Sequence, residues 1–293
     1  MSGAAFSPWH AWPDAPHIQQ SALEETLLGG QAFRWNRIND FWEGRWAQQV
    51  VRLRLNAGAL EFAIPRAEDP AATLCALRDY FALQTDFATL TDALPHRNDP
   101  VLKAAVNAFT GLRILRQPFG ETLFCFLCSS TKQIPQIKAI CEAVAADFGP
   151  QLADGSHALP DWPTIAAGSE ARLRQAKLGY RAKYIHQTAV FLAENPGWLE
   201  TTEAAPTQLA RQRLMQLPGV GRKIADCTLL FGAGRLEAFP IDTWVQKILV
   251  RAYGLETWSL EQLQHFAHIH FGHSAGYAQQ YLFAAARAGV LWD

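Results

Sequence analysis

The spacing of apolar residues changes once along the chain, near residue 70, and this change limits the fold more than any other feature. From Phe33 to Ile64 apolar and polar residues alternate in short runs, with turn signals at Asn39-Asp40 and at 56–58. Such alternation is typical of a half-buried antiparallel meander. From Pro70 onward apolar residues recur three and four positions apart, which is typical of helices packed on a core.

The helical pattern recurs in several segments that proline and glycine separate. We expect helices over Ala71–Leu83, Val101–Phe109, Glu121–Phe148, Glu170–Leu192, Pro206–Gln216, Arg222–Gly232, Thr243–Tyr253, Leu260–Phe271 and Ala275–Ala288. The sequence therefore predicts an α+β architecture, in which a small N-terminal antiparallel sheet domain precedes a mostly helical body. We place the sheet domain at residues 1–105 and the helical domains at 106–293, with two helices joined by a hairpin at about 206–232.

Composition excludes several classes of protein. The 293 residues contain no run of about 18 apolar residues, so we expect no membrane-spanning helix, and the N-terminus lacks the pattern of a secretory signal. Five scattered cysteines favour reduced thiols and a cytoplasmic location. A net charge of −1 argues against nucleic-acid binding unless basic residues gather locally. They do so between Ala171 and Ile185, which holds five basic residues and no acid.

The segment Leu217–Gly221 lies between two predicted helices and contains two glycines one residue apart. Gly219 and Gly221 allow a tight hairpin whose backbone can approach another molecule closely. The next helix begins near Arg222, so its free N–H groups and the positive end of its dipole face outward. This arrangement predicts a phosphate site, although the glycines alone favour an ordinary turn between helices.

Lys223 and Asp242, which follow the hairpin, favour a functional site over an ordinary turn. Lys223 lies in the first turn of the second helix, where the dipole disfavours a cation and so favours the neutral amine that a Schiff-base nucleophile needs. Cys227 follows four positions later on the same helix face. Asp242 is expected to be the N-cap of the next helix, with an ionised carboxylate facing outward. Taken singly, a solvated lysine and a simple cap explain them; after a phosphate-binding hairpin, the two together favour a catalytic pair.

The hairpin, the lysine two residues after it and the aspartate about twenty residues further on resemble the helix-hairpin-helix DNA glycosylase signature. Further segments resemble 8-oxoguanine DNA glycosylase and occur in that family's order from Leu23 to Phe283. They are Gly30–Trp35, Leu115–Pro118, Leu127–Ser130, Leu178–Tyr184 and Ala275–Gln279.

The resemblance implies a bifunctional DNA glycosylase and abasic-site lyase of base excision repair. Its substrate is double-stranded DNA containing 8-oxoguanine, and the lesion is flipped into a pocket. Lys223 would attack the sugar C1′, displace the base and form a Schiff base, and β-elimination would then nick the strand. Asp242 would stabilise positive charge on the sugar. The resemblance also implies a monomer, and we expect a nucleoid-associated protein of the bacterial cytoplasm.

The resemblance assigns four residues to the lesion pocket. The carbonyl of Gly30 would accept the N7 proton that distinguishes 8-oxoguanine from guanine, and Gln279 would read the Watson–Crick edge. Phe283 would stack on the base, and Cys227 would form the other wall. From the residues alone, a solvated helix position for Gln279 and a plain core position for Phe283 are the simpler interpretations.

A second set of residues would contact the DNA outside the pocket. Tyr180 resembles the wedge that fills the gap in the duplex, and Arg181 resembles the reader of the opposite base; a surface Tyr-Arg pair is the alternative. The complete set of expected DNA contacts is Thr131, Tyr180, Arg181, Gly219, Gly221, Arg222 and Trp244.

Three departures from the family pattern concern DNA contacts and not chemistry. Thr131-Lys132-Gln133 replaces a run of asparagines, Gln136 replaces an arginine that reads cytosine, and Trp244 replaces a histidine that contacts phosphate. We therefore predict a looser preference for cytosine opposite the lesion than in the eukaryotic enzyme.

We expect no cofactor and no iron–sulfur cluster, because no cysteine follows Cys227. Cys125 and Cys128 have C-x₂-C spacing, but we interpret them as buried thiols. A monovalent cation at the carbonyls of Met215, Leu217 and Val220 is a further family feature. Two other functions stay open at this point: a monofunctional glycosylase for alkylated bases, and a helix-hairpin-helix module that only binds DNA.

Overall fold

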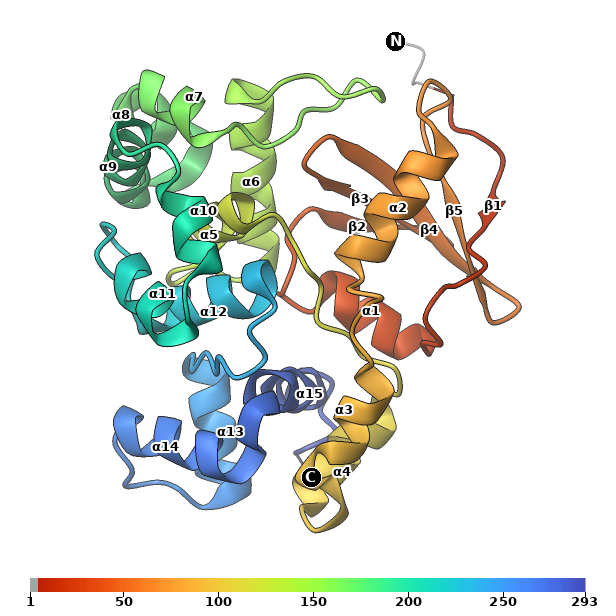
Figure 1. Ribbon diagram of the computed structural model, residues 1–293, viewed down its shortest axis with the longest axis vertical. Helices are drawn as coiled ribbons and strands as arrows, with labels where there is room; N and C mark the ends of the chain where they lie inside the picture. Colours follow the sequence, from red (N-terminus) through yellow and green to blue (C-terminus); the bar gives the residue numbers. More distant parts are fainter. Residues whose placement is uncertain (1–4, 293) are drawn as a thin grey trace.

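The computed structural model describes residues 5–292 and begins with a five-stranded antiparallel sheet (Figure 1). The strand order is β1-β5-β4-β3-β2, and the strands are β1 (His10–Ala11), β2 (Trp35–Ile38), β3 (Phe41–Trp46), β4 (Gln49–Asn56) and β5 (Ala59–Ala63). Asn39, Ala47 and Ala57 have positive φ in the three tight turns, as two-residue hairpin loops require. The predicted meander is confirmed, whereas the short edge strand β1 was not predicted.

The sheet packs on helices α1 (Gln20–Leu28) and α2 (Pro70–Tyr80), which cover one of its faces in Figure 1. The contact is aromatic: Trp46 stacks on Tyr80 with ring centroids 4.2 Å apart, and Trp35 Nε1 donates a hydrogen bond of 3.0 Å to the Tyr80 hydroxyl. Gly44 makes room for this stack, since a Cβ there would lie 2.3 Å from the Trp35 ring. The stack joins α2 to β2, which begins five residues after Gly30.

The rest of the chain forms helices in two groups (Figure 1). The first group lies beside the sheet and comprises α5 (Phe119–Cys128), α6 (Ile134–Phe148), α7 (Trp162–Ala167), α8 (Glu170–Leu173), α9 (Arg181–Glu194), α10 (Trp198–Ala204), α11 (Thr207–Leu214) and α12 (Arg222–Ala233). The second comprises α3 (Phe87–Ala93), α4 (Pro100–Ala108), α13 (Thr243–Tyr253), α14 (Leu260–Phe271) and α15 (Ala275–Arg287). In the second group α4 packs against α15, so a helix from the first half of the chain joins the C-terminal helices.

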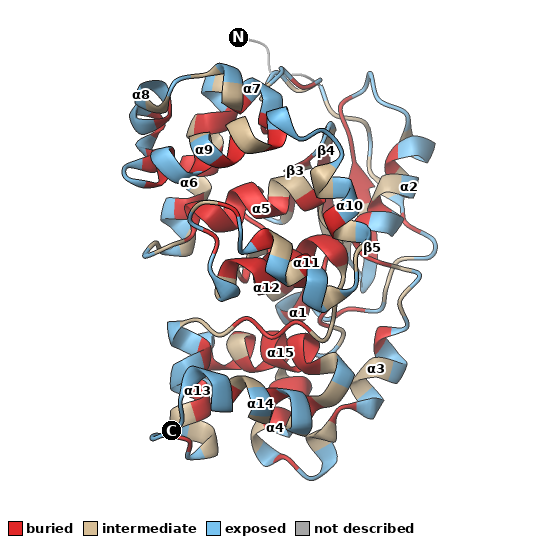
Figure 2. Ribbon diagram, turned by 60° about the vertical axis from the view of Figure 1, so that its left-hand side comes forward, coloured by how far each residue is buried: buried red, intermediate tan, exposed pale blue. Residues whose placement is uncertain are grey.

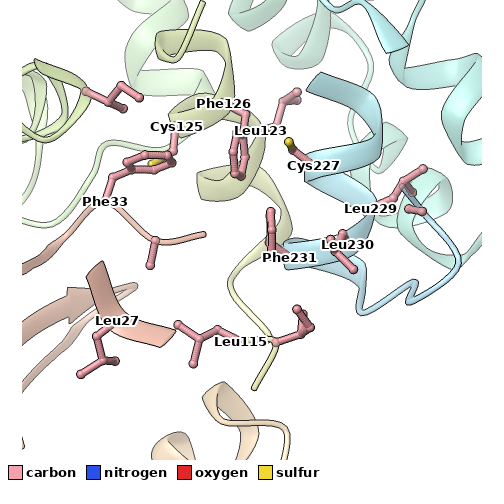
Figure 3. Close-up of a cluster of buried hydrophobic side chains, with 14 of the residues drawn as sticks. Leu27, Phe33, Leu115, Leu123, Cys125, Phe126, Cys227, Leu229, Leu230 and Phe231 are labelled. Carbon is pink, nitrogen blue, oxygen red and sulfur yellow. The ribbon is translucent and has the colours of Figure 1, made fainter. Parts of the chain in front are cut away.

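Helices α5, α12 and α15 supply the most buried surfaces (Figure 2). Phe126 of α5 lies edge-on to Phe33, with ring centroids 5.4 Å apart, and stacks on Phe231 of α12 at 5.5 Å. Figure 3 shows these rings and Leu115 filling the space between the sheet domain and the helices. This packing brings the N-terminal segment, α5 and α12 together.

Two long helices predicted from apolar spacing are wrong, because each is interrupted. The predicted helix Glu121–Phe148 is divided into α5 and α6, and Thr131 in the connection has a φ of 55°. The predicted helix Glu170–Leu192 contains a π-helical turn over Arg174–Leu178, and Lys177 there has a φ of 67°. Apolar spacing continues across both interruptions, so periodicity could not reveal them. Helices α1, α3, α7 and α10 were also not predicted.

Candidate active site and DNA-binding surface

A cavity of about 770 Å³ lies where α5, α12, the start of α13 and α15 meet the segment after α1. The structure brings together in its lining every residue predicted to be catalytic or to contact the lesion: Gly30, Lys223, Cys227, Asp242, Gln279 and Phe283. These residues come from four separate parts of the chain. A shared cavity is what a flipped nucleotide requires.

Lys223 enters the cavity from the first turn of α12 and packs against α5. Its Nζ donates a hydrogen bond of 3.1 Å to Ser129 Oγ and lies 5.0 Å from the centre of the Phe126 ring. Cys227 is buried one turn later on α12, and burial raises the pKa of its thiol to about 12 although Lys223 lowers it. The thiol is therefore protonated near neutral pH, so the lysine lies beside a neutral neighbour.

Asp242 is the N-cap of α13, as predicted. Its Oδ1 accepts a hydrogen bond of 2.8 Å from the Val245 backbone N–H. Asp242 and Lys223 do not form an ion pair: among residues 5–292, no N–O distance of 4 Å or less joins them. The carboxylate and the amine thus line one cavity without neutralising each other, which leaves both groups open to a substrate.

The predicted lesion pocket contains a glycine whose conformation disfavours other residues. Gly30 has a φ of 95°, and a Cβ there would lie 3.0 Å from Ile134 Cδ1. Gln279 is 5% exposed, and its Oε1 is buried without a hydrogen-bond partner in the described part of the chain. A solvated position for Gln279 is therefore wrong. Phe283 is half-buried at the cavity wall, so it is not a plain core residue either.

The predicted hairpin joins α11 to α12 and presents bare backbone. Gly219 has a φ of 78°, and a Cβ on it would lie 2.9 Å from the Tyr184 side chain. Gly221 is the N-cap of α12, and a Cβ there would meet nothing within 4 Å, so this peptide faces open space. Arg222 follows with an exposed side chain. The geometry fits an approaching phosphate.

The hairpin carbonyls are the predicted ligands of a monovalent cation. The Leu217 carbonyl accepts the Val220 N–H at 3.1 Å, so one of the three expected ligands already closes the hairpin. Within the described residues, no group of three or more His, Cys, Asp or Glu side chains could hold a metal ion. A monovalent cation at Met215, Leu217 and Val220 stays a prediction.

Tyr180 and Arg181 differ in exposure although they are neighbours. Tyr180 is 50% exposed just before α9, whereas Arg181 is 4% exposed. The Arg181 guanidinium donates to the Ser130 carbonyl and, at 2.9 Å, to Thr131 Oγ1, and it lies 4.4 Å from the Tyr180 ring centre. A simple surface pair is therefore wrong for Arg181. Trp244 is 43% exposed beside Asp242 and lines the cavity.

Sequence reasoning gave no role to two buried polar residues near the site. Ser129 bonds the amine of Lys223, and Asp226 of α12 pairs with Arg211 of α11 at 2.5 Å. Ser129 lies within a segment that carries the family resemblance, which was the only signal for it. Asp226 is spaced four residues from Arg222, a weak signal because such pairs are usually exposed.

The buried cysteines of α5 and α6 form one group. Cys125 Sγ lies 3.7 Å from Cys141 Sγ. Its hydrogen bond with Cys141, followed by burial, raises the pKa of Cys125, and burial raises that of Cys128. The interpretation of Cys125 and Cys128 as buried thiols is confirmed, and Cys141 is a third member.

The sequence matches two family models over nearly all of its length. Residues 16–123 match the 8-oxoguanine DNA glycosylase N-terminal domain, and residues 125–268 match the HhH-GPD superfamily base excision DNA repair protein. A probable N-glycosylase/DNA lyase of Methanothermobacter thermautotrophicus is 38% identical over 92% of this chain and 95% of its own length. The N-glycosylase/DNA lyase OGG1 of Arabidopsis thaliana is 32% identical, over 90% of this chain and 76% of its own.

Solved structures of DNA glycosylases also resemble this chain over nearly all of its length. The 8-oxoguanine glycosylase/lyase of Clostridium acetobutylicum, in complex with double-stranded DNA containing cytosine opposite 8-oxoguanine, has a TM-score of 0.85 and 27% identity over 97% of this chain and 99% of that one. The 3-methyladenine DNA glycosylase of Archaeoglobus fulgidus shares only the fold, with a TM-score of 0.74 and 18% identity over 96% of this chain and 99% of that one. The chain belongs to the 8-oxoguanine DNA glycosylase family of the HhH-GPD superfamily.

Proposed function

We propose that this N-glycosylase/DNA lyase uses Lys223 as its nucleophile and Asp242 as the group that stabilises positive charge on the sugar. One observation carries the proposal: the two side chains line the same cavity without pairing with each other. An ion pair between them would hold the amine as ammonium. Because none forms, a sugar can lie between the amine and the carboxylate.

The proposed reaction has two stages. The neutral Lys223 amine forms a bond to C1′ as the C1′–N9 bond breaks, and the base leaves with that electron pair and takes up a proton. The nitrogen loses a proton, the sugar ring opens with protonation of O4′, and an iminium forms. Loss of a C2′ proton then expels the 3′ phosphate by β-elimination. Asp242 would stabilise positive charge on the sugar during the first stage.

The lesion pocket would distinguish 8-oxoguanine from guanine by one hydrogen bond. The Gly30 carbonyl would accept the N7–H of the lesion, whereas guanine would direct a lone pair at the same oxygen. A buried acceptor without a donor costs about 1–3 kcal/mol. Gln279 would read the Watson–Crick edge, Phe283 would stack on the base, and Cys227 would form the opposite wall.

The DNA backbone would follow the hairpin and the start of α13. Gly219 and Gly221 leave the peptide accessible, Arg222 supplies charge, and the Trp244 indole supplies an N–H donor. Tyr180 would wedge into the duplex, and Arg181 would read the opposite base after leaving its contacts with Ser130 and Thr131. We propose a looser preference for cytosine, because Gln136 replaces the second arginine.

Other features belong to the same proposal. We propose a monomer that works without a cofactor or an iron–sulfur cluster, in a bacterial cytoplasm on the nucleoid. The five cysteines are free, which fits a reducing compartment. No helix among residues 5–292 has the length and apolar character needed to cross a bilayer.

Borohydride trapping tests the mechanism. The substrates are duplexes with 8-oxoguanine opposite each of the four bases, and the controls are Lys223→Gln and an undamaged duplex. We expect an adduct that requires both the lesion and Lys223. Base release without an adduct would indicate a monofunctional glycosylase, and neither product would leave only DNA binding; both outcomes contradict the proposal.

A further inference from the structure

Ser129 is buried at the C-terminal end of α5 and contacts the proposed nucleophile. Its Oγ lies 3.1 Å from Lys223 Nζ and 2.7 Å from the carbonyl oxygen of Phe126. The carbonyl can only accept, so the hydroxyl proton of Ser129 is donated to Phe126. Only the lone pairs of Oγ remain available, and they face the amine of Lys223.

The other neighbours of the amine are weak partners. The Phe126 ring lies 5.0 Å away, and the Cys227 thiol is neutral because burial raises its pKa to about 12. In the described part of the chain, Ser129 Oγ is the only side-chain oxygen within hydrogen-bond distance of Lys223 Nζ. The Cys227 thiol also hydrogen-bonds Lys223 but is the weaker acceptor, so this hydroxyl is the strongest acceptor near the amine.

We propose that Ser129 is a positioning residue for the nucleophile: it accepts an N–H of Lys223 and so keeps the nitrogen lone pair directed into the cavity. The proposal rests on the proposed role of Lys223. When the ammonium loses a proton, one of the two remaining N–H bonds still points to Ser129, which leaves the lone pair free to meet C1′. Ser129 itself touches neither the sugar nor the base in this scheme.

The local fold allows this role to be tested. The Phe126 carbonyl also accepts the Ser129 backbone N–H at 3.0 Å, so it stays bonded when the hydroxyl is removed. Thr122 gives a matched control on the same helix. It is buried seven residues before Ser129, and its hydroxyl donates to the Pro118 carbonyl at 2.8 Å, whereas the described hydrogen bonds of Lys223 Nζ do not include Thr122.

The experiment measures single-turnover base excision and borohydride trapping on an 8-oxoguanine duplex as a function of pH. For Ser129→Ala we expect the plateau rate to fall by about tenfold or more. The rising limb of the pH–rate profile should move to lower pH, because the ammonium form loses its acceptor. Ser129→Cys, which differs from serine in one atom and replaces the oxygen by a weak acceptor, should give the same shift if the alanine variant does not fold.

Two variants should leave the limb at its original pH: Ser129→Thr, which keeps the oxygen, and Thr122→Val. An unmoved limb in both the Ala and the Cys variant, with or without a slower rate, would overturn the proposal by assigning Ser129 a merely structural role. Lys223→Gln runs in parallel. An adduct in Lys223→Gln would refute the lysine mechanism. Loss of the adduct in Lys223→Gln, together with an unchanged pH–rate profile in Ser129→Ala and Ser129→Cys, would refute only the role of Ser129.

Discussion

Asp226 of α12 lies fully buried against α11, with its Oδ1 2.5 Å from the Nε of Arg211. Burial raises the pKa of Asp226, and Arg211 and Arg222 oppose this rise. The desolvation of the carboxylate thus exceeds the attraction of two arginines. The pair nevertheless joins α11 and α12, the two helices that flank the hairpin proposed to contact DNA.

The first prediction concerns this pair. Asp226→Ala should destabilise the protein by about 3 kcal/mol, because it leaves Arg211 without its buried partner. The double variant Arg211→Met/Asp226→Leu should cost far less, because it also removes the desolvation of both charges. Urea unfolding of wild type, Arg211→Met, Asp226→Leu and the double variant measures the coupling. Additive losses would show that the pair does not act as a unit.

Asp242 caps α13, and the proposed mechanism gives it a second, separable role as the charge that faces the sugar. Asp242→Asn should unfold at nearly the wild-type temperature, since asparagine caps a helix as well as aspartate does. Its single-turnover excision rate should fall by about 100-fold, because the charge opposite the sugar is lost. Asp242→Ala should lose the rate and, in addition, about 1 kcal/mol of stability. A normal rate in Asp242→Asn would remove Asp242 from the mechanism.

The two hairpin glycines should respond differently to alanine. Gly219→Ala should lower both thermal stability and DNA affinity, because the φ of 78° and the contact with Tyr184 exclude a Cβ. Gly221→Ala should keep its melting temperature, since space around that Cβ is open, yet bind DNA more weakly if a phosphate approaches there. Affinity on an undamaged duplex and thermal unfolding separate these effects. Wild-type affinity in Gly221→Ala would place the phosphate elsewhere.

The sequence predicted the parts of this molecule that repeat a pattern. The meander followed from alternation between Phe33 and Ile64, and most helices followed from apolar spacing. The capping role of Asp242 followed from its place before a helix. These features are local, so the residues that determine them lie next to one another in the chain.

What the sequence could not predict depends on contacts between distant segments. Ser129 meets Lys223 where α5 packs against α12, a packing that includes the stacked Phe126 and Phe231 rings. Arg181 is buried because the connection between α5 and α6 passes over it. The breaks at Thr131 and Lys177 place non-glycine residues at positive φ, a strain that tertiary packing must impose.

Glu121 gives a prediction about pH. Its carboxylate, at the start of α5, accepts the Ala47 N–H at 2.9 Å, and burial raises its pKa from 4.5 to about 7. An acid whose pKa is raised in the folded state makes the protein less stable as pH rises from about 4.5 to about 7, because ionisation then favours the unfolded chain.

At pH 8, Glu121→Gln should therefore be more stable than wild type, because the variant lacks the partly buried charge. After allowance for solvent screening, its free energy of unfolding should be higher by about 2 kcal/mol, which also raises its melting temperature. At pH 4 the difference should vanish, since a protonated glutamic acid and a glutamine have similar shape and polarity, and both can accept the Ala47 N–H. Melting curves of the two proteins from pH 4 to pH 8 test this. A constant difference across that range would show that folding leaves the pKa of Glu121 unchanged, because its bond to Ala47 then offsets its burial.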